Sequence, residues 1–107
     1  MRISIVTEDN RMFNDGLMFL VDCQNLRDKN IHAVQWYDEW GEVEYKTVWV
    51  KDEKHFHSEP NSHITDLSMV KAQTDEWNQH KKAFDLKNQL LEEERQKMLA
   101  QQEENLK

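Results

Sequence analysis

Three histidines in one segment, His55, His57 and His63, come closest in type and spacing to a metal site. On an extended chain the first two point the same way, because side chains alternate along a strand. Zinc in proteins is usually held by four protein ligands, or by three ligands and a water. No nearby cysteine or further ligand completes the set. A solvated loop is therefore the favoured interpretation, and we expect neither a metal nor another cofactor.

Two other groups of residues could do chemistry. Cys23, the only cysteine, could be a nucleophile with His32 as its base, but a lone cysteine after an apolar strand is more often a small buried residue. Neighbouring carboxylates could serve as acid and base, but they lie in a polar hairpin where solvent relieves their repulsion: Asp38 with Glu39, and Glu42 with Glu44. The two glycines stand far apart, which excludes a glycine-rich phosphate loop. We therefore expect a protein that is not an enzyme.

Aromatic residues are concentrated in one predicted hairpin: Trp36, Tyr37, Trp40, Tyr45 and Trp49. Some of them must form the core of so small a domain. Trp40 lies at the turn, where its own domain can hardly bury it, and aromatic side chains often anchor protein interfaces. We name Trp40, Tyr45 and Trp49 as candidate partner-binding residues, with packing inside the chain as an equal alternative.

Short strands are expected to position these residues. Residues 2–7 and 17–22 read as strands around the turn signal Asp15-Gly16. The second of these is apolar on both faces, so we expect it to be central or covered. Residues 31–37 and 42–50 form a second predicted hairpin, and residues 51–63 a loop, with a short strand around Phe56 as an alternative. Trp36 and Phe19 are the expected core residues.

A single long helix is predicted for residues 65–107, which contain neither proline nor glycine. Thr65, Asp66 and Ser68 are all suitable N-caps. Apolar side chains recur every seven positions, which is half of a coiled-coil seam: Val70, Trp77, Phe84, Leu91 and Met98. We expect residues 66–91 to pack on the head or on a partner, and residues 92–107 to be solvated. The candidate partner-binding residues of this helix are Val70, Trp77, Phe84 and Leu91.

Composition narrows the possible functions. The 107 residues carry a net charge of −7. Residues 1–64 hold 7 basic and 12 acidic side chains, a net charge of −5, which disfavours nucleic acid as a partner. No apolar run has the length of a membrane span or of a signal peptide, and a single cysteine cannot form an intrachain disulfide. We expect a soluble intracellular protein, or one that is released without secretion by the usual route.

These observations predict an α+β protein with two parts. The first, residues 1–64, is a small antiparallel β-sheet of about four strands in two hairpins. The second, residues 65–107, is one long C-terminal α-helix.

Several segments carry a resemblance when taken together: residues 3–10, the Asp15-Gly16 turn, residues 21–23, residues 31–37, residues 41–44, and Pro60-Asn61 followed by residues 64–67 and Trp77. The most specific part is residues 32–36, His-Ala-Val-Gln-Trp, followed by residues 41–44, Gly-Glu-Val-Glu. This succession resembles small proteins encoded among the structural and tail genes of tailed bacteriophages and prophages, over about residues 3–77.

The resemblance implies a role in the virion or the tail-fibre region, as a structural component or an assembly chaperone. The expected partners are other phage structural proteins of the tail or fibre, in the host cytoplasm during assembly or within the virion. A homo-oligomer through the C-terminal helix is also expected, as a trimer if the setting is a fibre. Two alternatives stay open: an acidic inhibitor of a host defence or host enzyme, and a small metal-dependent enzyme.

Overall fold

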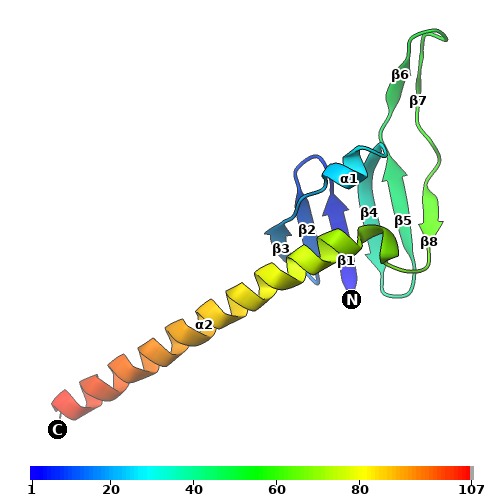
Figure 1. Ribbon diagram of the computed structural model, residues 1–107. Coiled ribbons are helices and arrows are strands. Elements are labelled where there is room, and N and C mark those ends of the chain that lie inside the picture. The colour runs from blue at the N-terminus through cyan, green and yellow to red at the C-terminus, as the bar shows by residue number, and fades with distance from the viewer. Residues whose placement is uncertain (107) are drawn as a thin grey trace. The chain divides into compact units, whose positions relative to one another are not determined.

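The main sheet of the computed structural model is antiparallel and has six strands in the order β3-β2-β1-β4-β5-β8 (Figure 1). The structure describes residues 1–106, so the last position of the predicted helix lies outside it. The strands are β1 (Arg2–Val6), β2 (Arg11–Asn14), β3 (Leu17–Leu20), β4 (Ile31–Tyr37), β5 (Gly41–Tyr45) and β8 (Ser62–Ile64). The α+β class is confirmed, with more strands than the four expected.

Apolar side chains on alternate positions of the central strands build one core. Ile3 and Ile5 of β1 are fully buried, as are Val34 of β4 and Val43 of β5. The short helix α1 (Gln24–Arg27) adds Leu26 to the same cluster. This alternation is what a sheet with one covered face requires.

The two expected core residues differ in their burial. Trp36 is buried in the core, as predicted. Phe19 is half-buried and packs against the core cluster. The strand that carries Phe19, β3, is an edge strand, so the expectation of a central or covered position is wrong for it. The Asp15-Gly16 turn folds β3 back along β2 as the first strand of the sheet order, and the side chains of Met18 and Leu20 stay exposed.

A second, separate sheet consists of the strands β6 (Val48–Val50) and β7 (His55–His57). Residues 42–50 were expected to be one strand, but β5 ends at Tyr45 and β6 pairs with a segment that was expected to be mostly loop. The short strand around Phe56 is present. Figure 1 shows this hairpin extending beyond the end of the main sheet.

The long helix begins with a 3-10 turn, η1 (Ser68–Val70), and continues as α2 (Lys71–Leu106). The carboxylate of Asp66 accepts hydrogen bonds from the backbone N–H of Ser68 at 2.9 Å and from its hydroxyl at 2.5 Å. The hydroxyl bond and then the backbone bond hold the pKa of Asp66 below its ordinary value. Asp66 thus forms a local side-chain turn with Ser68, whereas the N-cap of the 3-10 turn is Leu67, which makes no side-chain cap hydrogen bond and is none of the three residues expected there.

Two compact units divide the chain, Met1–Trp77 and a second unit that starts at Asn78. The division falls inside α2 rather than between residues 64 and 65, because the first turns of the helix belong to the core of the first unit. Among residues 1–106, no helix has an apolar stretch of the length and purity that crossing a membrane demands.

Candidate protein-interaction site

The hairpin β6–β7 carries the most exposed aromatic pair of the first unit. Trp49 and Phe56 face each other across the two strands, with ring centroids 5.0 Å apart in an edge-to-face arrangement. Their side chains are nevertheless 53% and 70% exposed. Val48, on the neighbouring position, is exposed as well. The hairpin therefore presents apolar surface that its own two strands cannot cover.

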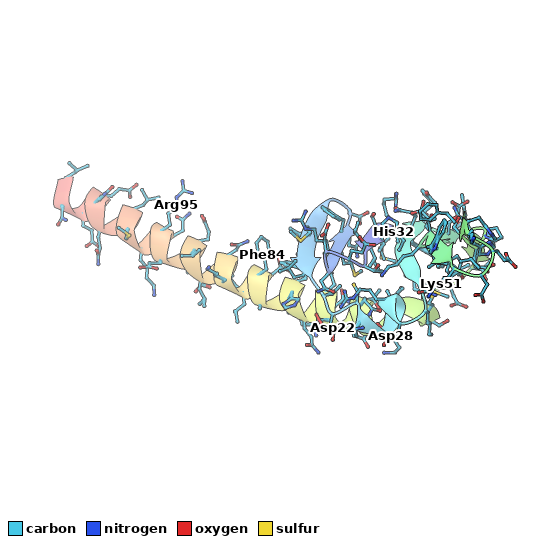
Figure 2. All side chains as sticks on the ribbon, turned by 90° about the horizontal axis from the view of Figure 1, so that it is seen from above. Asp22, Asp28, His32, Lys51, Phe84 and Arg95 are labelled. Carbon is cyan, nitrogen blue, oxygen red and sulfur yellow. The ribbon has the colours of Figure 1, made fainter. Side chains whose placement is uncertain are left out.

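Charged residues form the turn of this hairpin, which is marked by Lys51 in Figure 2. The turn is the sequence Lys-Asp-Glu-Lys, residues 51–54. Nitrogen atoms of the β7 histidines lie near carboxylates: His55 is 3.5 Å from Glu53, and His57 is 3.1 Å from Glu59. An exposed aromatic centre inside a polar border is the arrangement that protein interfaces use.

Trp40, the candidate anchor of the β4–β5 turn, packs against neighbours of its own chain. Its ring lies 4.7 Å from that of Tyr37 and is stacked at 5.6 Å on His63 of β8. The guanidinium of Arg2 lies over the Tyr37 ring, 4.4 Å from its centroid. Part of Trp40 stays exposed. Trp40 thus packs partly inside its own chain, while the exposed part of its ring is open to a partner.

Tyr45 is half-buried against the core, and its hydroxyl shares a hydrogen bond of 2.8 Å with the hydroxyl of Ser62. It also borders a polar pocket of about 310 Å³ whose other lining residues are Glu8, His32, Lys46 and Thr47. In that pocket His32 Nδ1 lies 3.5 Å from a carboxylate oxygen of Glu8. Tyr45 is therefore a structural residue first, with only part of its ring available to a partner.

Two residues named as partner-binding from the heptad pattern are buried inside the first unit. Val70 is fully buried and Trp77 is 6% exposed, and both belong to the core cluster of the first unit. They lie where the start of the helix covers the sheet, so a partner cannot reach them. Phe84 and Leu91, the next members of the same series, lie on the second unit and are exposed.

The residues considered for chemistry are not assembled into a site. Within residues 1–106 no group of three or more histidine, cysteine or acidic side chains could hold a metal ion. Cys23 is fully buried, and this burial raises the pKa of its thiol to about 11, so it is not a thiolate at neutral pH. A second pocket, of about 320 Å³, is lined by the acidic residues Asp9, Asp22 and Glu76 together with Asn10, Leu20 and Val21.

Phe56, like Val48, is an exposed residue of this hairpin that the sequence did not identify as a binding candidate. The alternation His-Phe-His was a strand signal, but only the pairing of β6 with β7 places Phe56 beside Trp49.

The chain matches no protein-family model, no curated protein and no solved structure in the comparisons made.

Proposed function

We propose that the protein acts by binding other protein chains during the assembly of a bacteriophage particle, in its tail or tail-fibre region. The observation that carries the binding role is the exposed Trp49–Phe56 pair on a hairpin with no core of its own. The proposed binding surface is the side of this hairpin that carries the pair; Val48, the next residue in the strand, lies on the opposite side.

Energetics support that role for the hairpin. An isolated two-stranded sheet is marginally stable in water. Burying a large apolar side chain that is otherwise exposed contributes about 1.5–3 kcal/mol. Covering Trp49 and Phe56 with a partner would therefore both stabilise the hairpin and supply a large share of the binding free energy.

The phage setting is supported by the sequence resemblance over residues 3–77, since the comparisons supply no relative. That resemblance gives other tail or fibre proteins as the partners, and no catalytic step. Under this proposal the protein is not an enzyme and functions in the host cytoplasm during assembly, with incorporation into the particle as the structural-component variant of the same role.

One observation favours the acidic inhibitor as a second candidate. The first unit, residues 1–77, holds 8 basic and 15 acidic side chains, a net charge of −7, whereas residues 78–107 hold 6 of each and are neutral. The whole net charge thus belongs to the folded unit that would present it. An inhibitor that imitates nucleic acid would lose its effect when carboxylates of this unit are reversed, whereas an assembly protein would tolerate such changes on surfaces away from its partner.

The experiment compares particle production by hosts that carry the wild-type gene or the Trp49→Ser, Phe56→Ser double variant. We expect the double variant to remain folded and to lower the yield of intact particles at least tenfold. The matched control is Leu20→Ser, which removes an equally exposed apolar side chain from β3. Mass spectrometry of purified particles separates a structural component, which is present, from a chaperone, which is absent. A wild-type yield with the double variant would overturn the proposal.

A further inference from the structure

One side of the second unit's helix combines exposed apolar residues with two opposite charges. At about 100° per residue, six residues fall within an arc of about 100°. We call them the Lys87–Glu94 face: Ala83, Lys87, Leu90, Leu91, Glu94 and Met98. Leu90, Leu91 and Met98 are 56%, 53% and 59% exposed. Figure 2 shows the side chains of this stretch, between the labelled Phe84 and Arg95, standing out from the helix.

Lys87 and Glu94 make no ion pair within residues 1–106. The ion pairs of the second unit lie on another side of the helix. There the Lys81 ammonium is 2.6 Å from the Asp85 carboxylate, and the Arg95 guanidinium is 4.0 Å from Glu92. Lys87 and Glu94 thus place one cation and one anion, without an ion pair in the described part of the chain, at the centre of the apolar face.

The two halves of the helix differ in charge. Residues 78–91 hold three lysines and one aspartate, a net charge of +2, with histidine counted as neutral. Residues 92–106 hold five glutamates, one arginine and one lysine, a net charge of −3. A parallel pair of such helices would set like charges side by side. An antiparallel pair sets the basic half of one helix against the acidic half of the other, which is favourable.

The face is also complementary to itself. Leu90 and Leu91, Lys87 and Glu94, and Ala83 and Met98 are each placed symmetrically about the midpoint between residues 90 and 91. A two-fold axis through that midpoint would bring Leu90 beside the other copy's Leu91 and Lys87 beside its Glu94. Self-complementarity of one patch is what a two-fold interface between identical chains requires.

We propose that the Lys87–Glu94 face pairs with the same face of a second copy of this chain, antiparallel, with Leu90 and Leu91 at the two-fold axis and Lys87 of each copy paired with Glu94 of the other. This arrangement disfavours the parallel trimer that a fibre setting suggests, because three-fold symmetry would align the charged halves in parallel. The inference goes beyond the proposed function, whose binding surface is the β6–β7 hairpin, so either can fail without the other.

The first test uses charge reversal in the full-length protein, with sedimentation equilibrium as the measurement. Wild type is expected to be a dimer at micromolar concentration. Lys87→Glu and Glu94→Lys should each raise the dissociation constant roughly tenfold, because each replaces two symmetric attractions with repulsions. The double variant should return to the wild-type value, because it exchanges the two charges. The same reversals off the face, Lys82→Glu and Glu93→Lys, are the controls: they change the net charge of one half of the helix but no cross-chain pair, so they should raise the dissociation constant much less than tenfold.

The second test fixes the orientation by disulfide formation. In the antiparallel pair the two copies of residue 83 are separated by about 22 Å along the helix, at ~1.5 Å per residue. Ala83→Cys alone and Met98→Cys alone should therefore not cross-link under mild oxidation, whereas a mixture of the two variants should. The native Cys23 is fully buried, and oxidation of wild type under the same conditions controls for cross-linking through it.

Each outcome decides the inference. A wild-type chain that stays monomeric at high micromolar concentration would overturn it, as would efficient self-linking of either single cysteine variant, which indicates a parallel pair. A monomer that still requires Trp49 and Phe56 for particle assembly would leave the proposed function in place. If wild type is a dimer but the Trp49→Ser, Phe56→Ser variant gives a normal particle yield, the helix pairing stands and the proposed function is overturned.

Discussion

Trp77, near the start of α2, donates a hydrogen bond from its indole Nε1 to the backbone carbonyl of Leu17 across 3.2 Å. The same ring packs edge-to-face against Phe19, with centroids 5.4 Å apart. One side chain thus joins the helix to the edge strand β3, a segment sixty residues earlier in the chain. This contact explains why the first turns of α2 belong to the first unit.

Replacing Trp77 should show how far this contact stabilises the fold. Trp77→Ala removes a buried aromatic side chain and should lower the free energy of unfolding by about 3–5 kcal/mol. Trp77→Phe keeps most of the apolar contact and loses the hydrogen bond, which should cost about 1–2 kcal/mol with the volume change included. Urea unfolding followed by circular dichroism measures both. Leu99→Ala, on the exposed second unit, should shift the value by less than about 0.5 kcal/mol; equal effects of Trp77→Ala and Leu99→Ala would contradict the core assignment.

The two glycines should respond to substitution for different reasons. A Cβ at Gly41 would collide with the backbone carbonyl oxygen of Gln35, and would lie 3.0 Å from the Trp36 ring. Gly41→Ala should therefore cost about 1–3 kcal/mol through overpacking. Gly16 has open space around its Cβ position but a φ of +87°, so Gly16→Ala should cost about 1–2 kcal/mol through backbone strain.

Asparagine separates these two causes, because it tolerates positive φ better than alanine but is larger. Gly16→Asn should be milder than Gly16→Ala, whereas Gly41→Asn should be worse than Gly41→Ala. Thermal midpoints are a sufficient measurement, since 1 kcal/mol moves the midpoint of a domain of this size by about 4–8 °C. The same order at both positions would show that one of the two explanations is wrong.

Gln73 joins α2 to α1 and to the residue Asp22 before it through a buried amide. Its Nε2 donates to the Asp22 carbonyl at 2.8 Å and to Asn25 Oδ1 at 2.6 Å, and its side chain is almost fully buried. Gln73→Glu replaces this donor with a buried carboxylate next to two acceptors. At pH 7 we expect a loss of about 3 kcal/mol in the free energy of unfolding.

Acid should relieve that loss, because the carboxyl group that Gln73→Glu introduces could donate a hydrogen bond once it is protonated. The difference between wild type and Gln73→Glu should therefore shrink when both are measured at pH 4. Gln73→Met, which has similar length and no charge, is the control: it should cost less at pH 7, and its cost should not depend on pH. A pH-independent difference for Gln73→Glu would mean that the carboxylate has escaped to solvent.

Cys23 links stability to alkaline pH. Burial is the main cause that raises the pKa of its thiol to about 11. The nearby Arg27 lowers this pKa, and the carboxylates of Asp22 and Glu76 raise it. In the unfolded chain the thiol titrates near its ordinary value of about 8.5. The native state therefore keeps the proton that the unfolded state loses, and the free energy of unfolding should fall as pH rises from about 8.5 to 11.

Two measurements check this prediction. Urea unfolding at pH 7.5 and pH 10 should show a smaller pH-dependent loss for Cys23→Ala than for wild type. A thiol-reactive dye at pH 8 should label native Cys23 slowly and urea-unfolded Cys23 quickly. Rapid labelling of the native protein would place the thiol at the surface.

The sequence alone was sufficient for the features that depend on neighbouring residues. The Asp15-Gly16 turn and the long helix follow from local backbone preferences, which are short-ranged. The α+β class follows from these elements together. For Trp49 the sequence left partner binding and packing inside the chain as equal alternatives, and only the structure shows its side chain to be exposed.

Tertiary structure alone decided which residues share an environment. The heptad series from Val70 to Met98 lies on one side of the helix, yet Trp77 is in the core while Leu91 is exposed. Periodicity reports which side chains share a side of a helix but not what covers that side. Likewise, β3 is apolar on both faces yet lies at an edge, and Phe56 meets Trp49 only through strand pairing. Such pairings join residues distant in sequence, so their free energies depend on the whole fold and leave no local pattern to read.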